Sequence, residues 1–106
     1  MTEAEFAGEV EARIRAAGLL YHWCRDSRRC AGQRGFPDLI IAGSRGLLAA
    51  ELKLADGETT AGQDLWGWTI RESGHAWVLW QPADLGNGRI DSALMLLTLG
   101  RPSVPP

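Results

Sequence analysis

The sequence predicts a single α/β domain in which helices flank a mixed four-stranded sheet. Three apolar runs of strand length come one after another, and a helical stretch then separates them from a fourth run. The helical connection makes the last two strands parallel and the crossover right-handed, so the order of elements is αβββαβ. A chain of 106 residues, 45% hydrophobic and 23% charged, is long enough for one such core.

The first helix is expected over residues 2–17. Thr2 and Glu5 have the spacing of a capping box at its start, and Gly18 ends it. Apolar residues recur on one side of this helix and mark its buried face: Phe6, Val10, Ile14 and Ala17.

The later elements follow from apolar runs and the breaks between them. They are expected in this order: a strand at 19–23, an arginine-rich loop at 24–35, a hairpin with strands at 38–42 and 47–54, a helix at 61–73, a strand at 76–80 and a helix at 89–99. Residues 1–100 are therefore assigned to one domain and residues 101–106 to a disordered tail.

Apolar spacing also predicts which side chains of these elements are buried. In the helix at 61–73 the core-facing residues are expected to be Leu65, Trp66, Thr69 and Ile70, and in the last helix Ile90, Leu94 and Leu97. Among the five tryptophans, three are assigned to the core and two to the surface: Trp66, Trp77 and Trp80 inside, Trp23 and Trp68 outside.

The hairpin has a predictable register. Its two runs meet at a Gly-Ser-Arg-Gly turn, and a two-residue loop there places Gly43 opposite Gly46. The same register places Asp38 directly opposite Glu51, with Lys53 on the same face two residues further on. Two carboxylates and an ammonium group therefore converge at one end of an otherwise apolar hairpin.

This convergence of charge predicts a metal site. Carboxylates directly opposite each other destabilise a sheet, and buried acidic side chains are rarely left without a partner. A divalent cation such as Mg²⁺ resolves the conflict, because it binds carboxylates, waters and a backbone carbonyl, which Leu52 can offer. The alternative is an exposed strand face. Against it, Lys53 is the only lysine among eleven basic residues, and a compact ammonium differs chemically from the arginine fork.

The residues around the hairpin resemble a nuclease signature. Pro37-Asp38 followed by Glu51-Leu52-Lys53 resembles the PD-(D/E)xK motif, and the wider series is similar to the VRR-NUC family: Ser27-Arg28-Arg29, Gly35-Phe36-Pro37-Asp38-Leu39, Gln63 with Trp66, and Gly74 before a strand. The resemblance extends over about residues 2–85. It implies a restriction-endonuclease-like αβββαβ core and a Mg²⁺-dependent deoxyribonuclease, an endonuclease that hydrolyses phosphodiester bonds and in which Mn²⁺ would substitute.

The resemblance also implies the members of the catalytic set: Asp38, Glu51, Lys53, Gln63 and Glu5. Those expected to hold the metal are Asp38, Glu51, Glu5 and the Leu52 carbonyl. Two other glutamates of the first helix, Glu3 and Glu9, compete with Glu5, and a solvated helix face is the alternative for all three. Gln63 has a structural alternative as well, because Thr60 precedes it at capping-box spacing.

Basic residues are concentrated in the loop before the hairpin. The net charge is −2, but four of the eleven basic residues fall within ten positions: Arg25, Arg28, Arg29 and Arg34. Because this loop leads directly into the Pro-Asp strand, we expect contacts with DNA phosphates from Ser27, Arg28, Arg29 and Arg34. A solvated loop is the alternative.

Several other classes are not expected. His22, Cys24 and Cys30 match no usual zinc spacing and lack a fourth ligand. Two cysteines make no disulfide framework, which favours free thiols and a cytoplasmic location in a phage or bacterial setting. No run approaches the length of a membrane span.

Two functions of different classes therefore remain open besides the nuclease. One is a catalytically inactive nucleic-acid-binding module of the same fold, and the other is a plain interaction domain whose hairpin charges are solvated. The resemblance itself implies structure-selective cleavage of branched or flap DNA, a role in DNA repair or recombination, and often a homodimer.

Overall fold

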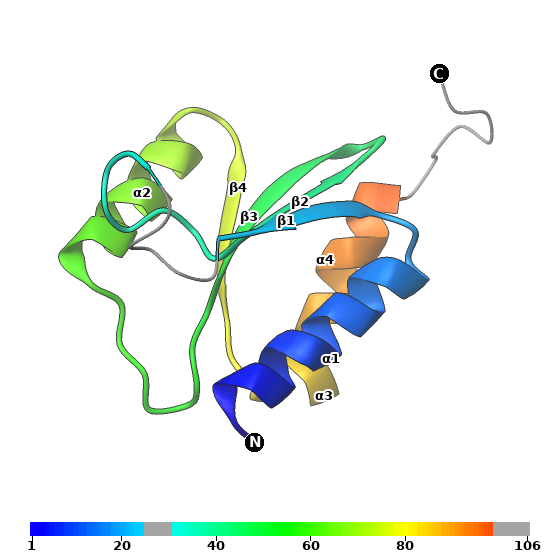
Figure 1. Ribbon diagram of the computed structural model, residues 1–106. Coiled ribbons are helices and arrows are strands. Elements are labelled where there is room, and N and C mark those ends of the chain that lie inside the picture. Colours follow the sequence, from blue (N-terminus) through cyan, green and yellow to red (C-terminus); the bar gives the residue numbers. More distant parts are fainter. Residues whose placement is uncertain (25–30, 99–106) are drawn as a thin grey trace.

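Four strands form one sheet in the order β1-β2-β3-β4 (Figure 1). The strands are β1 (Leu20–Trp23), β2 (Leu39–Gly43), β3 (Gly46–Leu52) and β4 (Ala76–Trp80). The first three pair antiparallel, and β4 pairs parallel with β3. This computed structural model describes residues 1–24 and 31–98. It confirms the predicted αβββαβ order and the mixed sheet.

Helices cover both faces of the sheet. They are α1 (Glu3–Ala16), α2 (Ala61–Glu72), α3 (Ala83–Gly86) and α4 (Arg89–Thr98). In Figure 1, α1, α3 and α4 lie together on one face, and α2 lies apart from them beside β4. The short α3 follows Pro82 and was not predicted, because four residues are too few to show a helical period.

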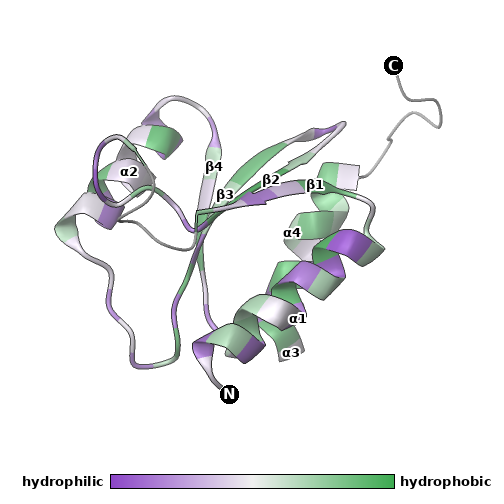
Figure 2. Cartoon of the chain, in the orientation of Figure 1, coloured by the Kyte–Doolittle hydropathy of each residue, from purple (hydrophilic) through white to green (hydrophobic). Residues whose placement is uncertain are grey.

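The hydrophobic core lies between the sheet and the pair α1 and α4. In Figure 2, β2 and β3 are coloured as hydrophobic over much of their length. The predicted stripe of α1 is buried except for Ala17, which is partly buried, and all three predicted residues of α4 are buried: Phe6, Val10, Ile14, Ile90, Leu94 and Leu97. The sheet supplies Leu39, Ile41, Leu48, Ala50 and Trp80.

The hairpin has the predicted register. Gly43 pairs with Gly46, and Leu39 pairs with Ala50 at the other end. Asp38 and Glu51 are the next residues on the two strands, so they lie at the open end of the hairpin. Their position follows from the turn, because one slipped residue would move every side chain to the other face.

The buried face of α2 differs from the prediction. Leu65 is 60% exposed and Thr69 is also exposed, so their assignment to the core is wrong. The helix instead packs through Gly67, where an added Cβ would lie 2.9 Å from the Trp77 ring. Only a glycine lets α2 approach Trp77 this closely. Trp68 is 63% exposed, as predicted.

Three further observations concern the ends and the loops. Cys24 is disulfide-bonded, so the expectation of a free thiol is wrong at this residue. The expected tail at 101–106 lies outside the described residues. Within 1–24 and 31–98, every helix is too short or too polar to cross a membrane.

Candidate active site

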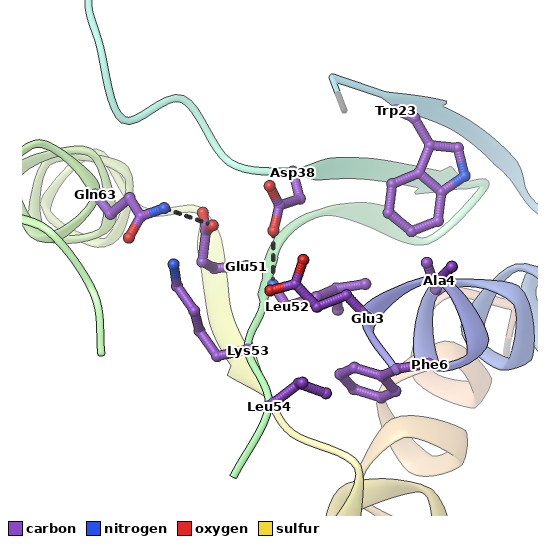
Figure 3. Close-up of a pocket in the computed structure, with 11 residues that line it drawn as sticks. Glu3, Ala4, Phe6, Trp23, Asp38, Glu51, Leu52, Lys53, Leu54 and Gln63 are labelled. Carbon is purple, nitrogen blue, oxygen red and sulfur yellow. Dashed lines mark hydrogen bonds between the residues drawn. The ribbon is translucent and has the colours of Figure 1, made fainter. Parts of the chain in front are cut away.

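A pocket of about 370 Å³ opens at the end of β3, between the first turns of α1 and α2 (Figure 3). Four of the predicted catalytic side chains line it: Asp38, Glu51, Lys53 and Gln63. Glu51 lies in β3, Asp38 directly precedes β2, Lys53 directly follows β3 and Gln63 lies in α2. The hairpin register and the placement of α2 together decide their geometry.

Asp38 is fixed by the neighbouring strand. Its Oδ2 accepts a hydrogen bond from the backbone N–H of Leu52 at 2.9 Å. The N–H and C=O of a strand residue point to the same side, so the Leu52 carbonyl also faces the Asp38 side of β3. The predicted carbonyl ligand and the predicted carboxylate therefore lie on one side of the strand.

Glu51 is buried at the end of β3 with only 1% of its surface exposed. Its Oε1 accepts a hydrogen bond from Nε2 of Gln63 at 2.8 Å, whereas its Oε2 is buried without a hydrogen-bond partner. Burial, and next the neighbouring carboxyl group of Asp38, raise the pKa of Glu51 to about 8, and the charge of Lys53 opposes this rise. Without a cation, Glu51 therefore favours its protonated form at neutral pH.

Gln63 takes part in both of the structures that its sequence context suggested. Its backbone N–H donates to Oγ1 of Thr60 at 3.2 Å, and its Oε1 accepts from the backbone N–H of Thr60 at 2.8 Å, which completes a capping box. A backbone N–H can only donate, so this bond turns the amide nitrogen of Gln63 toward Glu51. The helix cap thus orients the side chain that holds Glu51.

Close contacts join α2 to the loop that carries Asp38. A Cβ on Gly35 would lie 2.2 Å from the backbone carbon of Gly62, and Gly35 also has a φ of +93°. The rings of Phe36 and Trp66 meet edge to face with centroids 5.1 Å apart, and Nε1 of Trp66 donates to the Gln33 carbonyl at 3.4 Å. We call this contact the loop–helix joint. It sets the distance between Asp38 and Gln63.

Of the three competing glutamates Glu3, Glu5 and Glu9, it is Glu3 that lines the pocket. Glu5 instead accepts the Thr2 backbone N–H at 2.8 Å in the capping box of α1, and that hydrogen bond lowers the pKa of Glu5. Glu9 pairs with Arg13 at 3.0 Å. Glu3, rather than Glu5, therefore shares the pocket with Asp38 and Glu51.

The predicted phosphate-binding residues are only partly described. Ser27, Arg28 and Arg29 lie outside the described residues. Arg34 is exposed and lies in the loop that contacts α2, where its carbonyl oxygen is 3.0 Å from the Cβ position of Gly62. The expectation for these four residues stays a prediction.

A divalent cation fits the pocket by the chemistry of its donors. The described residues contain no cluster of three or more His, Cys, Asp or Glu side chains placed to hold a metal. Two opposed carboxylates are present, however, and Oε2 of Glu51 is a buried acceptor with nothing to accept. A hard cation would satisfy this atom and offset the repulsion between Asp38 and Glu51.

Sequence reasoning missed one wall of the pocket. Ala4, Phe6, Ala7 and Trp23 line the side opposite the carboxylates. Phe6 was predicted as a core residue and is buried. Trp23 was predicted as a surface residue, but it is partly buried and packs against the core, so that prediction is wrong. The sequence carried one usable signal for Glu3, because the capping box that starts α1 already occupies Glu5.

The fold and the pocket together define the class: the chain has the restriction-endonuclease-like fold. Among solved structures it is similar to a VRR_NUC domain protein, with 21% identity, a TM-score of 0.68 and 92% of each chain covered. It is also similar to Hjc of Archaeoglobus fulgidus, a Holliday junction resolvase, with 21% identity and a TM-score of 0.52 over 74% of this chain and 67% of that one. No family model matches the chain, and no curated protein matches it. The resemblance noted from the hairpin motif is thus confirmed in the fold.

Proposed function

We propose that this protein is a metal-dependent deoxyribonuclease, an endonuclease that hydrolyses phosphodiester bonds in DNA. The proposal depends most on one observation, the buried and unpartnered Oε2 of Glu51 beside the carboxylate of Asp38. Burial beside Asp38 makes ionisation of Glu51 costly, and a bound cation would offset that cost.

The residues suited to hold Mg²⁺ or Mn²⁺ are Asp38, Glu51, the Leu52 carbonyl and, from α1, Glu3 in place of Glu5. In phosphodiester hydrolysis a cation of this kind neutralises negative charge on the phosphate and activates water. The donor set is made entirely of oxygen, which suits these ions better than zinc.

The remaining side chains of the pocket have separate roles in this proposal. Lys53 lies on the Glu51 face of β3, and its backbone N–H is held by the Trp80 carbonyl at 3.0 Å. Its ammonium group would stabilise the negative charge that grows as water adds to phosphorus and the ester oxygen departs. Gln63 keeps the Glu51 carboxylate in one orientation through its amide.

The choice of DNA as substrate is part of the proposal. The Holliday junction resolvase with the same fold supports branched DNA as the substrate, and flap DNA is proposed with it. Phosphate contacts from Ser27, Arg28, Arg29 and Arg34, a homodimer, a cytoplasmic location in a phage or bacterial setting, and a role in DNA repair or recombination belong to the same proposal.

The test is cleavage of labelled linear, flapped and four-way-branched DNA with Mg²⁺, Mn²⁺ or EDTA. We expect cutting only with metal, and we expect Lys53→Ala to lose it while Arg45→Ala, at the exposed hairpin turn, keeps it. If no DNA is cut by the wild type, the nuclease proposal fails. Salt-sensitive DNA binding in that case would support the inactive binding module instead.

A further inference from the structure

The pocket has two chemically different sides. Asp38, Glu51, Lys53 and Gln63 gather on one side in Figure 3, and Trp23, Ala4 and Phe6 lie on the other, with Glu3 between them. The polar side accounts for a cation, a phosphate and a water. None of these three is expected to bind the apolar side, because each is strongly hydrated or charged.

Trp23 forms a fixed wall of the apolar side. It lies at the end of β1, where it pairs with Leu39, the residue after Asp38. Its indole Nε1 donates to Oε2 of Glu11 at 2.8 Å. The polar atom of the indole is thus directed at α1, and the side chain lines the pocket.

Two alanines make the space in front of this wall. Ala4 and Ala7 are three residues apart on α1, so they lie one above the other on the same helix face and both line the pocket. Longer side chains at these positions would fill the apolar side without touching the carboxylates. The small side chains of Ala4 and Ala7 therefore leave the apolar side of the pocket open.

We propose that the apolar side of the pocket receives an unpaired nucleobase next to the phosphate that is cleaved. This inference rests on the proposed function, and it adds the kind of substrate. A nucleotide whose phosphate is held by the polar side also carries a flat, weakly hydrated base, and aromatic side chains bind such bases in a sequence-tolerant way. A base in a duplex stays stacked on its neighbours and enters a side pocket only after unstacking, which costs free energy.

The pocket thereby gives a physical reason for selectivity toward DNA structure. Bases at a flap, a junction or a single-stranded end are already unstacked, so they enter without that cost. Duplex DNA is expected to be the poorer substrate even where its phosphates are bound equally well. No dedicated sequence-reading element is needed for this discrimination.

The experiment combines a modified substrate with a filled pocket. The cleavage position in flap DNA is mapped first, and abasic nucleotides are then placed one at a time on either side of it. Wild type is compared with Ala4→Leu and with Ala12→Leu, a matched control at an exposed position of α1. Leucine is a good helix former, so both variants should fold, which thermal unfolding checks.

At one position, we expect base removal to raise the wild-type KM about fivefold or more, in keeping with the loss of one base–aromatic stack. Ala4→Leu should raise KM on intact DNA to a similar degree, and base removal should then have no further effect in that variant. Ala12→Leu should behave as wild type. Equal KM for intact and abasic DNA in the wild type, or effects that multiply in Ala4→Leu, would overturn the inference.

The two proposals can fail separately. If wild-type protein cuts intact and abasic flaps equally well, the nuclease stands and the base pocket falls. If it cuts nothing, the same oligonucleotides are compared by fluorescence anisotropy, with one abasic nucleotide moved stepwise along the single strand. Equal affinity at every position then overturns the base pocket, and weaker affinity at one position supports it.

Discussion

Two acidic side chains are buried in the described part of the protein, and their surroundings are opposite. Asp84 in α3 is 5% exposed and fully partnered: its oxygens accept from the Gln81 backbone N–H at 2.9 Å, from Asn87 at 3.1 Å and from Arg89 at 3.2 Å. Glu51 has one hydrogen bond, one unpartnered oxygen and a second carboxyl group beside it.

The pKa values of Asp84 and Glu51 are shifted in opposite directions because the two buried carboxyl groups differ in their partners. Burial raises the pKa of Asp84, but the hydrogen bonds from Gln81 and Asn87 and the charge of Arg89 outweigh it, so the pKa is lowered overall. At Glu51 the neighbouring carboxyl group of Asp38 adds to the effect of burial, the charge of Lys53 opposes it only in part, and the pKa rises to about 8. A carboxylate that serves only the fold is given its partners by the fold, whereas Glu51 keeps an oxygen available for a ligand.

The largest effect should come from exchanging each acid for its amide. Glu51→Gln keeps the size of the side chain and an acceptor for Gln63 but removes the charge, so we expect DNA cleavage to fall at least about a hundredfold. The same change should leave the free energy of unfolding unaltered or raise it, because a neutral amide can be buried beside Asp38 without taking up a proton. Cleavage rates and urea unfolding measure the two effects.

Asp84→Asn is the matched control, and we expect it to lower stability without changing cleavage. An amide cannot accept from all three donors, so we expect a loss of about 1 to 3 kcal/mol in unfolding free energy. The folded variant should cleave DNA at the wild-type rate. If Glu51→Gln destabilised the protein as much as Asp84→Asn, Glu51 would be a structural acid like Asp84, and the functional contrast would be wrong.

The next effect concerns what holds the pocket in shape. Gly35→Ala is expected to cost about 3 kcal/mol or more, because it strains a positive φ and drives a Cβ into the backbone of Gly62. Gly32 has a φ of +113° with nothing within 4 Å of its Cβ position, so Gly32→Ala should show the strain alone, about 1 to 2 kcal/mol.

Urea unfolding of the two glycine variants isolates the cost of the close approach. Gly35→Ala should also lower cleavage in the protein that remains folded, because the loop–helix joint sets Gln63 relative to Asp38. Equal losses of stability in both variants would show that the loop–helix joint does not constrain the pocket.

The sequence was enough for the hairpin and its charges, because register depends on the turn and on period-two alternation. It was not enough for α2. The apolar pattern favoured burial of Leu65, and only the tertiary contact between Gly67 and Trp77 shows why the helix is rotated away from that pattern. A glycine in the middle of a helix lowers its predicted helix propensity, although Gly67 is where α2 packs closely against Trp77.

The two capping boxes are a second case in which sequence spacing does not predict the role of a side chain. Glu5 and Gln63 occupy the same capping position in α1 and α2, and both accept from the backbone N–H of the capping threonine. Gln63 has an amide nitrogen left over for Glu51, whereas Glu5 has only another oxygen and lies outside the pocket. Spacing alone treats the two positions as equivalent.

The smallest predicted effect is a pH dependence of stability in the absence of metal. The pKa of Glu51 rises from 4.5 to about 8 on folding, so between these values the native state binds a proton that the unfolded chain does not. The free energy of unfolding in EDTA should therefore fall as pH rises from about 5 to 8.

Three comparisons isolate the source of this slope. Glu51→Gln should remove it, and Mg²⁺ should oppose it by stabilising the protein more at pH 8 than at pH 5.5, because the cation binds the deprotonated carboxylates. Asp84 contributes with the opposite sign, since its lowered pKa gives stability that is lost as pH falls, so Asp84→Asn should change only the acid side of the profile. A wild-type slope that survives in Glu51→Gln would mean that another group titrates, and that Glu51 is already partnered in the folded protein.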